Sequence, residues 1–176
     1  MARAGDLVFV SGTVGDAALG LLALRGDLAG GDAAATAPLV ARYRRPEPRV
    51  DLGLALRGLA SACADVSDGL IADLGHICDA SGVGAALRAD RLPLSAAARS
   101  LVARDAALLG AVLSGGDDYE LVFTAPANRE PDLAKAAASA GVPVTVIGQV
   151  IRGAGVSVVD ETGAEVPLDA AGFRHF

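Results

Sequence analysis

Apolar residues follow two different spacings along the chain, and their alternation predicts strands interleaved with helices. The segment 7–14, LVFVSGTV, is rich in β-branched and aromatic residues and contains glycine near its end, which favours a buried strand. The segment 68–80 instead spaces its apolar residues on one face of an amphipathic helix. The same criteria predict strands over 62–66, 83–89, 119–124, 142–151 and 155–163, and helices over 16–28, 50–60, 94–113 and 129–141.

Capping and turn residues set the expected boundaries of these elements. Asp16 is the expected N-cap of the first helix, and Gly141 is the expected stop signal of the helix over 129–141. The small, Gly-rich segment 29–38 is expected to be a loop, and the prolines of 39–48 end any helix there. Without an internal repeat or linker, the sequence predicts one α/β (α+β) domain over 1–176, with a mixed β-sheet covered by helices.

Composition and charge narrow the function classes. Of the 176 residues, 52% are hydrophobic but only 3% are aromatic, so Ala, Val and Leu must fill a packed core. The net charge of −6 argues against a nucleic-acid partner, because phosphate binding needs a basic surface. Cys63 and Cys78 are too few for a disulfide framework or a zinc site and are expected to be buried thiols. The N-terminus has neither a signal peptide nor a membrane span, which predicts a cytoplasmic location.

The motif DVSDGL, residues 65–70, places two carboxylates around the expected start of a helix. Ser67 or Asp68 alone is an ordinary N-cap, favoured there by the helix dipole. Asp65 adds a carboxylate at the end of a strand, where α/β proteins bind ligands. Two carboxylates and a hydroxyl also suit Mg²⁺, which usually keeps substrate phosphates in its shell, so the motif allows either a helix cap alone or a cap beside a magnesium site. His76, two turns along the helix, is expected at the surface rather than as a base.

A second motif, SGGDDYEL over 114–121, allows two interpretations. It is an ordinary glycine turn with solvated aspartates, or it is a ligand loop. In the ligand loop, Gly115 and Gly116 allow a ligand to approach the backbone closely, and Asp117 and Asp118 face that ligand. The motif in isolation does not decide between the two.

Taken together and in order, these motifs resemble the C-terminal domain of the thiamine-monophosphate kinase family. The matching segments are GDLVFVSGTVGDAALGL, YRRPEPRVDLG, ADVSDGLIADLGHI, RLPLS, LSGGDDYELVFT and the closing GFRHF. This family belongs to the superfamily of aminoimidazole ribonucleotide synthetase, selenophosphate synthetase and the hydrogenase maturation dehydratase. The resemblance spans nearly the whole chain, and SDGL combined with the DYEL motif favours the kinases over their relatives.

The resemblance implies transfer of the γ-phosphate of ATP to thiamine monophosphate, giving thiamine diphosphate, with several Mg²⁺ ions. It assigns Mg²⁺ to Asp65 and Asp68, and ATP to Ser67. It assigns the thiamine substrate to Asp117 and Phe173, where Asp117 replaces the usual glutamate and is shorter by one methylene. No residue is expected to act as a catalytic base, because phosphoryl transfer depends on positioning and charge neutralisation.

The family also carries an N-terminal domain that supplies further metal ligands, most nucleotide contacts and the interface of a homodimer. We expect this domain to be absent from the chain, and the chain alone to bind little ATP and to lack kinase activity. Two alternatives remain open. One is another ATP-using member of the superfamily with a different substrate. The other is a non-catalytic, stand-alone domain that binds a phosphorylated ligand or a partner chain.

Overall fold

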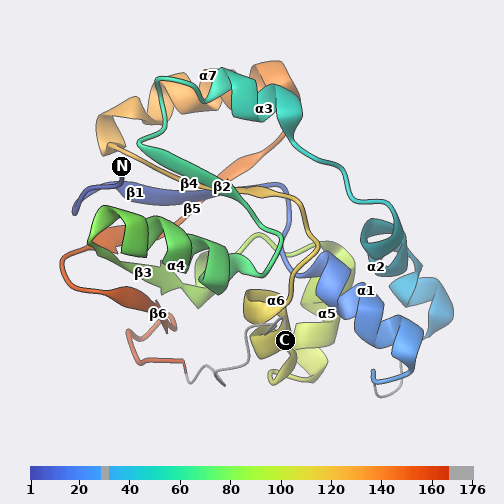
Figure 1. Cartoon of the computed structure of the whole chain (residues 1–176). Coiled ribbons are helices and arrows are strands. Elements are labelled where there is room, and N and C mark those ends of the chain that lie inside the picture. The colour runs from blue at the N-terminus through green and yellow to red at the C-terminus, as the bar shows by residue number, and fades with distance from the viewer. Residues whose placement is uncertain (29–31, 167–176) are drawn as a thin grey trace.

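A computed structural model describes residues 1–28 and 32–166, and it confirms an α/β fold with a mixed sheet (Figure 1). The strands are β1 (Leu7–Ser11), β2 (Ala62–Asp65), β3 (Gly84–Arg88), β4 (Leu121–Ala125), β5 (Val144–Ile151) and β6 (Gly155–Val159). They form one sheet in the order β2-β4-β1-β5-β3-β6. The β3–β6 pair is parallel and the other neighbouring pairs are antiparallel, so strands distant in sequence lie side by side.

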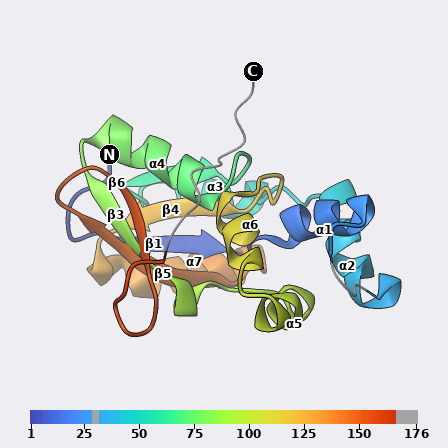
Figure 2. The ribbon, with the colours of Figure 1, turned by 90° about the horizontal axis from the view of Figure 1, so that it is seen from below.

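Helices cover both faces of the sheet and extend beyond one end of its strands. In the described part of the chain they are α1 (Asp16–Arg25), α2 (Ala33–Arg44), α3 (Val50–Ala55), α4 (Leu70–Ser81), α5 (Ala96–Arg104), α6 (Leu108–Ser114) and α7 (Glu130–Ala140). α3 and α7 lie over one face and α4 over the other, whereas α1 and α2 project beyond the strand ends (Figures 1 and 2). None of the helices between residues 1 and 28 or 32 and 166 is both long and apolar enough to cross a membrane.

Two apolar clusters form the core, one on each face of the sheet. Alternation along β1 sends Val8 and Val10 to the side of α4 and Phe9 to the side of α3 and α7. Phe9 stacks on Phe123 of β4, with ring centroids 5.1 Å apart. Most other core residues are Ala, Val, Leu or Ile, as the low aromatic content predicts.

The loop predicted over 29–38 is wrong from residue 33 onward, where α2 begins. The carboxylate of Asp32 accepts the backbone N–H of Ala34 at 3.0 Å and caps the helix. The alanines that follow favour a helix, and Pro38 lies inside it. A polar cap beside good helix formers therefore outweighs the small-residue composition that predicted a loop.

The segment 94–113, predicted to be mostly helical, forms two helices, α5 and α6. The side chain of Asp105 accepts the N–H of Ala107 at 3.0 Å, which makes a local turn between them. Aspartate competes with helical hydrogen bonding in this way. The helix is therefore interrupted at Asp105, although the apolar periodicity of the sequence continues through it.

Two cap predictions and the cysteine prediction have different outcomes. Gly141 ends α7 in the left-handed conformation, with φ of 66°, as predicted. Gly15 is the N-cap of α1, so the prediction for Asp16 is wrong by one residue. Cys78 is buried as expected, but Cys63 is exposed, and both thiols are free. Cys63 lies on β2, which is an edge strand of the sheet, so no neighbouring strand lies along its outer side.

Candidate ligand-binding site

The two motifs form one structural unit at the end of β2 and the start of β4. The N–H of Tyr119 donates to the carbonyl of Val66 at 2.9 Å, and the N–H of Asp117 donates to that of Ser67 at 3.0 Å. The N–H of Val66 in turn donates to the carbonyl of Glu120 at 2.7 Å. Backbone pairing thus fixes the 65–70 segment against the 114–120 segment.

Glycine is required where these segments meet. A Cβ on Gly116 would overlap the backbone carbonyl of Ser67, and a Cβ on Gly69 would lie 2.5 Å from the carbonyl oxygen of Ser114. A Cβ on Gly115 would overlap Ala18 of α1. The backbone at Gly115 and Gly116 therefore packs closely against neighbouring protein atoms, and both residues also line an adjacent cavity.

A cavity of about 610 Å³ lies beside this unit and is bounded by α1, α2 and α6. It brings together three residues assigned by resemblance, because Ser67, Asp68 and Asp117 all line it. Asp65 is not among its lining residues, and Phe173 lies outside the described residues. The lining also includes small and apolar residues, two tyrosines and an arginine: Ala17, Ala18, Leu21, Leu22, Arg25, Tyr43, Ala111, Ser114, Gly115, Gly116 and Tyr119.

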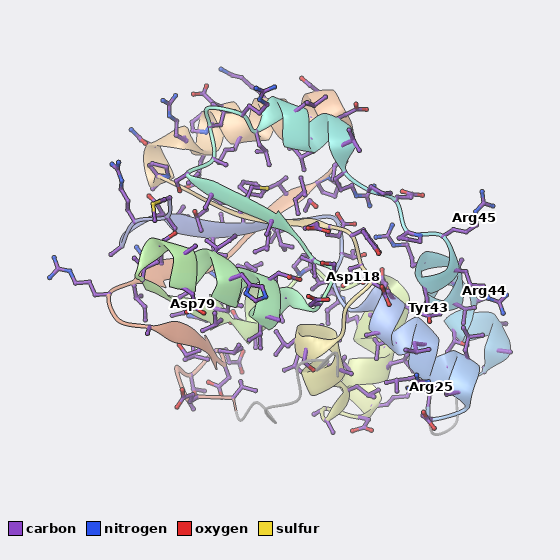
Figure 3. The ribbon with its side chains drawn as sticks, viewed as in Figure 1. Arg25, Tyr43, Arg44, Arg45, Asp79 and Asp118 are labelled. Carbon is purple, nitrogen blue, oxygen red and sulfur yellow. The ribbon has the colours of Figure 1, made fainter. Side chains whose placement is uncertain are left out.

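The tyrosines and Arg25 were not predicted as site residues. Tyr43 comes from α2 and Arg25 from the last turn of α1, and Figure 3 shows both on the helices that project beyond the strands. Tyr119 belongs to the DYEL motif and has a left-handed backbone, with φ of 53°. Only the position of α2, which the sequence interpretation partly assigned to a loop, brings Tyr43 to the cavity.

Carboxylates gather beside the cavity at the start of α4. Burial raises the pKa of Asp73, and the charges of Asp68 and then Asp65 add to this increase, while backbone hydrogen bonds oppose it. Ligand atoms of Asp68, Asp73 and His76 all lie within 4.8 Å of one another. His76 is exposed, as predicted, but it stands closer to the carboxylates than expected. The two carboxylates of this set suit Mg²⁺, which prefers oxygen ligands, whereas His76 offers a nitrogen and Asp65 is not part of the set.

The cap predicted for α4 is wrong in its residue. Gly69 occupies the N-cap position and offers no side chain. Instead, the carboxylate of Asp73 reaches back from the first turn and accepts the N–H groups of Ser67 at 2.9 Å and Asp68 at 3.0 Å. Asp73 therefore orients the two predicted ligand-binding residues, because both of their amides are fixed to it.

Replacing Asp73 by alanine is expected to lower the free energy of unfolding by about 2 kcal/mol, because two backbone donors lose a charged acceptor. The matched control is Asp79→Ala, at an exposed position of the same helix that Figure 3 shows away from α1. Urea denaturation at pH 7 measures both. Equal stabilities of the two variants would contradict this capping role.

Asp118 points into the protein, which overturns the hypothesis that it faces a ligand. It is 1% exposed, and its carboxylate accepts the N–H of Gly15 at 2.5 Å and that of Ala17 at 3.0 Å, which caps α1. Burial raises the pKa of Asp118 to about 7, with a smaller raising effect from the nearby charge of Asp16. Asp118 therefore joins the DYEL motif to the helix that forms one wall of the cavity.

Glu120, the next buried carboxylate, is the centre of a network that was not predicted. Its side chain is 0% exposed. It accepts hydrogen bonds from Arg49 Nε at 2.9 Å and Nη2 at 2.6 Å, from Arg42 Nη2 at 2.8 Å and from Ser11 Oγ at 2.5 Å. The bond to Glu120 raises the pKa of Arg49. The basic segment 42–49 and the DYEL motif were both visible in the sequence, but nothing in their spacing indicated that they pair.

The mixed sheet, with carboxylates gathered beside a cavity at one end of its strands, defines an α/β domain with a candidate site for a small ligand. The chain belongs to the family described as AIR synthase related protein, C-terminal domain, whose model matches residues 3–161.

Individual relatives and solved structures agree with this family. The thiamine-monophosphate kinase of Salmonella typhimurium is 45% identical over 176 residues, covering 99% of this chain and 54% of that protein. The crystal structure of thiamine-monophosphate kinase from Stenotrophomonas maltophilia has a TM-score of 0.80 at 49% identity, covering 89% of this chain and 51% of that one. The structure of AaThiL complexed with AMPPCP and TMP has a TM-score of 0.78 at 35% identity, covering 99% and 52%.

These matches confirm the resemblance to the C-terminal domain of thiamine-monophosphate kinases. The chain spans about half the length of the curated relatives it matches.

Proposed function

We propose that this chain is the part of a thiamine-monophosphate kinase that holds thiamine monophosphate and one side of the ATP site. The whole enzyme would transfer the γ-phosphate of ATP to thiamine monophosphate, giving thiamine diphosphate. The observation that carries the proposal is that Ser67, Asp68 and Asp117 line one and the same cavity. Support comes from the kinases to which the chain is 43–45% identical, and from the similarity to AaThiL complexed with AMPPCP and TMP.

The cavity suits the thiamine moiety in size and chemistry. Its volume of about 610 Å³ is within the usual range for small-molecule sites. Thiamine carries a flat aminopyrimidine and a positively charged thiazolium ring. Tyrosine faces attract cationic rings, and Tyr43 and Tyr119 both line the cavity together with the carboxylate of Asp117. We assign Asp117 to the thiamine substrate, and Phe173 remains a predicted contact in the undescribed C-terminal segment.

The phosphate end of the reaction is assigned to the start of α4. Asp65 and Asp68 would hold Mg²⁺, and the hydroxyl of Ser67 would contact ATP. Bound Mg²⁺ supplies the positive charge that two polyanionic substrates need beside these carboxylates. Asp73 holds the amides of Ser67 and Asp68 in place, so that the chain contributes positioning rather than a catalytic base.

We assign the remainder of the active site to the half of the relatives that lies outside the match with this chain. Relatives are about twice as long, and their additional half is proposed to supply further metal ligands, nucleotide contacts and the interface of a homodimer. We therefore expect the 176-residue chain alone to bind thiamine monophosphate but to form no thiamine diphosphate.

Calorimetric titration of the chain with thiamine monophosphate tests this assignment. Asp117→Asn is expected to weaken binding about tenfold, because it removes the charge that faces the cationic ring. Asp117→Glu is expected to retain binding, since it keeps that charge. Asp79→Asn, an exposed substitution on α4, serves as the control.

A parallel titration with the ribonucleotide precursor of aminoimidazole ribonucleotide separates the proposal from its nearest alternative. Tight binding of that ligand, with no binding of thiamine monophosphate, would assign the chain to another branch of the superfamily. Binding of neither ligand would favour a stand-alone, non-catalytic domain.

A further inference from the structure

The loop between α6 and β4 contains two residues with an unusual backbone. Asp117 and Tyr119 have φ of 70° and 53°, and they are the non-glycine residues with positive φ among residues 1–28 and 32–166. The left-handed region is unfavourable for residues with a Cβ, and it persists only where the surrounding structure holds it. Both residues line the cavity, so the unusual backbone and the proposed ligand contacts coincide.

Asp118, which lies between these two residues, and Glu120, which follows them, are turned into the protein. Asp118 and Glu120 are 1% and 0% exposed. The loop therefore alternates between two cavity-facing side chains and two buried carboxylates. Each buried carboxylate is anchored to a different part of the fold, because Asp118 binds the start of α1 and Glu120 binds side chains of β1, of α2 and of the segment before α3.

The anchor at Glu120 is the stronger constraint on the loop. Arg49 contacts both of its oxygens, which fixes the plane of the carboxylate. Arg42 binds the same carboxylate and also donates to the backbone carbonyl of Asp118 at 3.4 Å. Ser11 donates to Glu120 and accepts the N–H of Leu121 at 2.8 Å. These bonds leave the backbone on both sides of Tyr119 little freedom to rotate.

The same network reaches the opposite wall of the cavity. Arg42 is followed directly by Tyr43, which lines the cavity from α2. A Cβ on Gly12 would overlap the Glu120 carboxylate, so the sequence keeps space for that group beside β1. One buried carboxylate thus connects the two tyrosine-bearing walls.

We infer that Glu120, held by Arg42, Arg49 and Ser11, is a positioning residue that fixes Asp117 and Tyr119 in their left-handed conformation before a ligand arrives. The identity of that ligand rests on the proposed function. In that function, the network presents a carboxylate and an aromatic ring to the flat cationic part of thiamine monophosphate.

Hydrogen exchange of single amides, followed by NMR, tests the inference without a ligand. In Glu120→Gln, the amides of Asp117 and Tyr119 are expected to exchange at least tenfold faster, while the amides of β1 change much less. The matched control is Glu47→Gln, since Glu47 contacts Arg49 at 3.1 Å but its side chain is 70% exposed. This control is expected to leave the loop amides unchanged.

If Glu120 only stabilised the fold, Glu120→Gln would raise the exchange rates of the loop amides and of the β1 amides by similar factors. That result would overturn the inference, and so would unchanged exchange rates in the loop. If Glu120→Gln does not fold, Arg49→Lys replaces it, because lysine keeps the charge but cannot contact both oxygens in the same plane. The same expected and contrary results apply to that variant.

Titration with thiamine monophosphate separates this inference from the proposed function. Glu120→Gln is expected to bind at least tenfold more weakly than the unmodified chain, and Glu47→Gln equally well. If the unmodified chain binds no thiamine monophosphate, the proposed function fails, whereas the exchange rates still decide whether Glu120 positions the loop.

Discussion

Replacing Gly116 by alanine is expected to lower the free energy of unfolding by about 3 kcal/mol, which is at the upper end of the cost of overpacking. The added methyl group would overlap the carbonyl oxygen of Ser67 and crowd the backbone of Asp68. These are backbone atoms and cannot turn aside as a flexible side chain would. The two motif segments must therefore separate, and the cavity between them and α1 must change shape.

Gly110→Ala is the matched control for this prediction. Gly110 lies in α6, and a Cβ there would meet no atom within 4 Å. Alanine is the better helix former, so this variant is expected to gain about 0.5–1 kcal/mol. Urea denaturation measures both variants, and a Gly116→Ala protein as stable as the Gly110→Ala protein would show that the two segments do not need their close contact.

Stability is expected to fall as the pH rises through the range set by Asp118. The pKa of this carboxyl rises from 3.8 to about 7 on folding, so the folded chain binds its proton more tightly than the unfolded chain. The resulting stabilisation is complete below pH 3.8 and is lost as the pH rises through about 7. Since one pKa unit corresponds to about 1.4 kcal/mol, the loss amounts to at most about 4 kcal/mol.

The comparison of the unmodified chain with Asp118→Asn isolates this effect, because groups common to both proteins cancel. Asparagine is neutral at every pH and turns a donor towards two N–H groups, so the variant is expected to be less stable at pH 5. At pH 8 the difference is expected to vanish or to reverse. Asp105→Asn, at an exposed turn, corrects for the general effect of replacing a capping aspartate. A difference that is constant from pH 5 to pH 8 would contradict the prediction.

Local sequence patterns were sufficient for most of the strands and for the fold class. The ranges predicted for β2 and β3 are correct to within one residue at either end, although the two strands, ACAD and GAALR, contain no β-branched residue. Helix boundaries were less well predicted. Asp32 and Asp105 both form local bonds to the backbone, and one starts a helix whereas the other interrupts one.

The candidate site was predicted in part, and there is a clear physical reason why its other residues were not predicted. Ser67, Asp68 and Asp117 were named from motif resemblance, and the cavity brings them together. Sequence could not show that Asp118 turns inward, because adjacent residues point to opposite sides and the pattern DD fits either register. Nor could it show that Glu120 pairs with Arg49, since the two are 71 residues apart and charged residues are usually solvated.

The strand order also has a consequence for how the chain folds. β1 lies between β4 and β5, so Leu7 is paired with Ala125 on one side and with Gln149 on the other. Pairing across such separations is slow, because a long loop must close before any contact rewards it. During synthesis, β1 therefore cannot pair with β4 or β5 until residues 121–151 have been made. The cavity forms with this late pairing, since α1 directly follows β1 and the DYEL motif directly precedes β4, so a ligand that fills it stabilises the completed sheet as a whole.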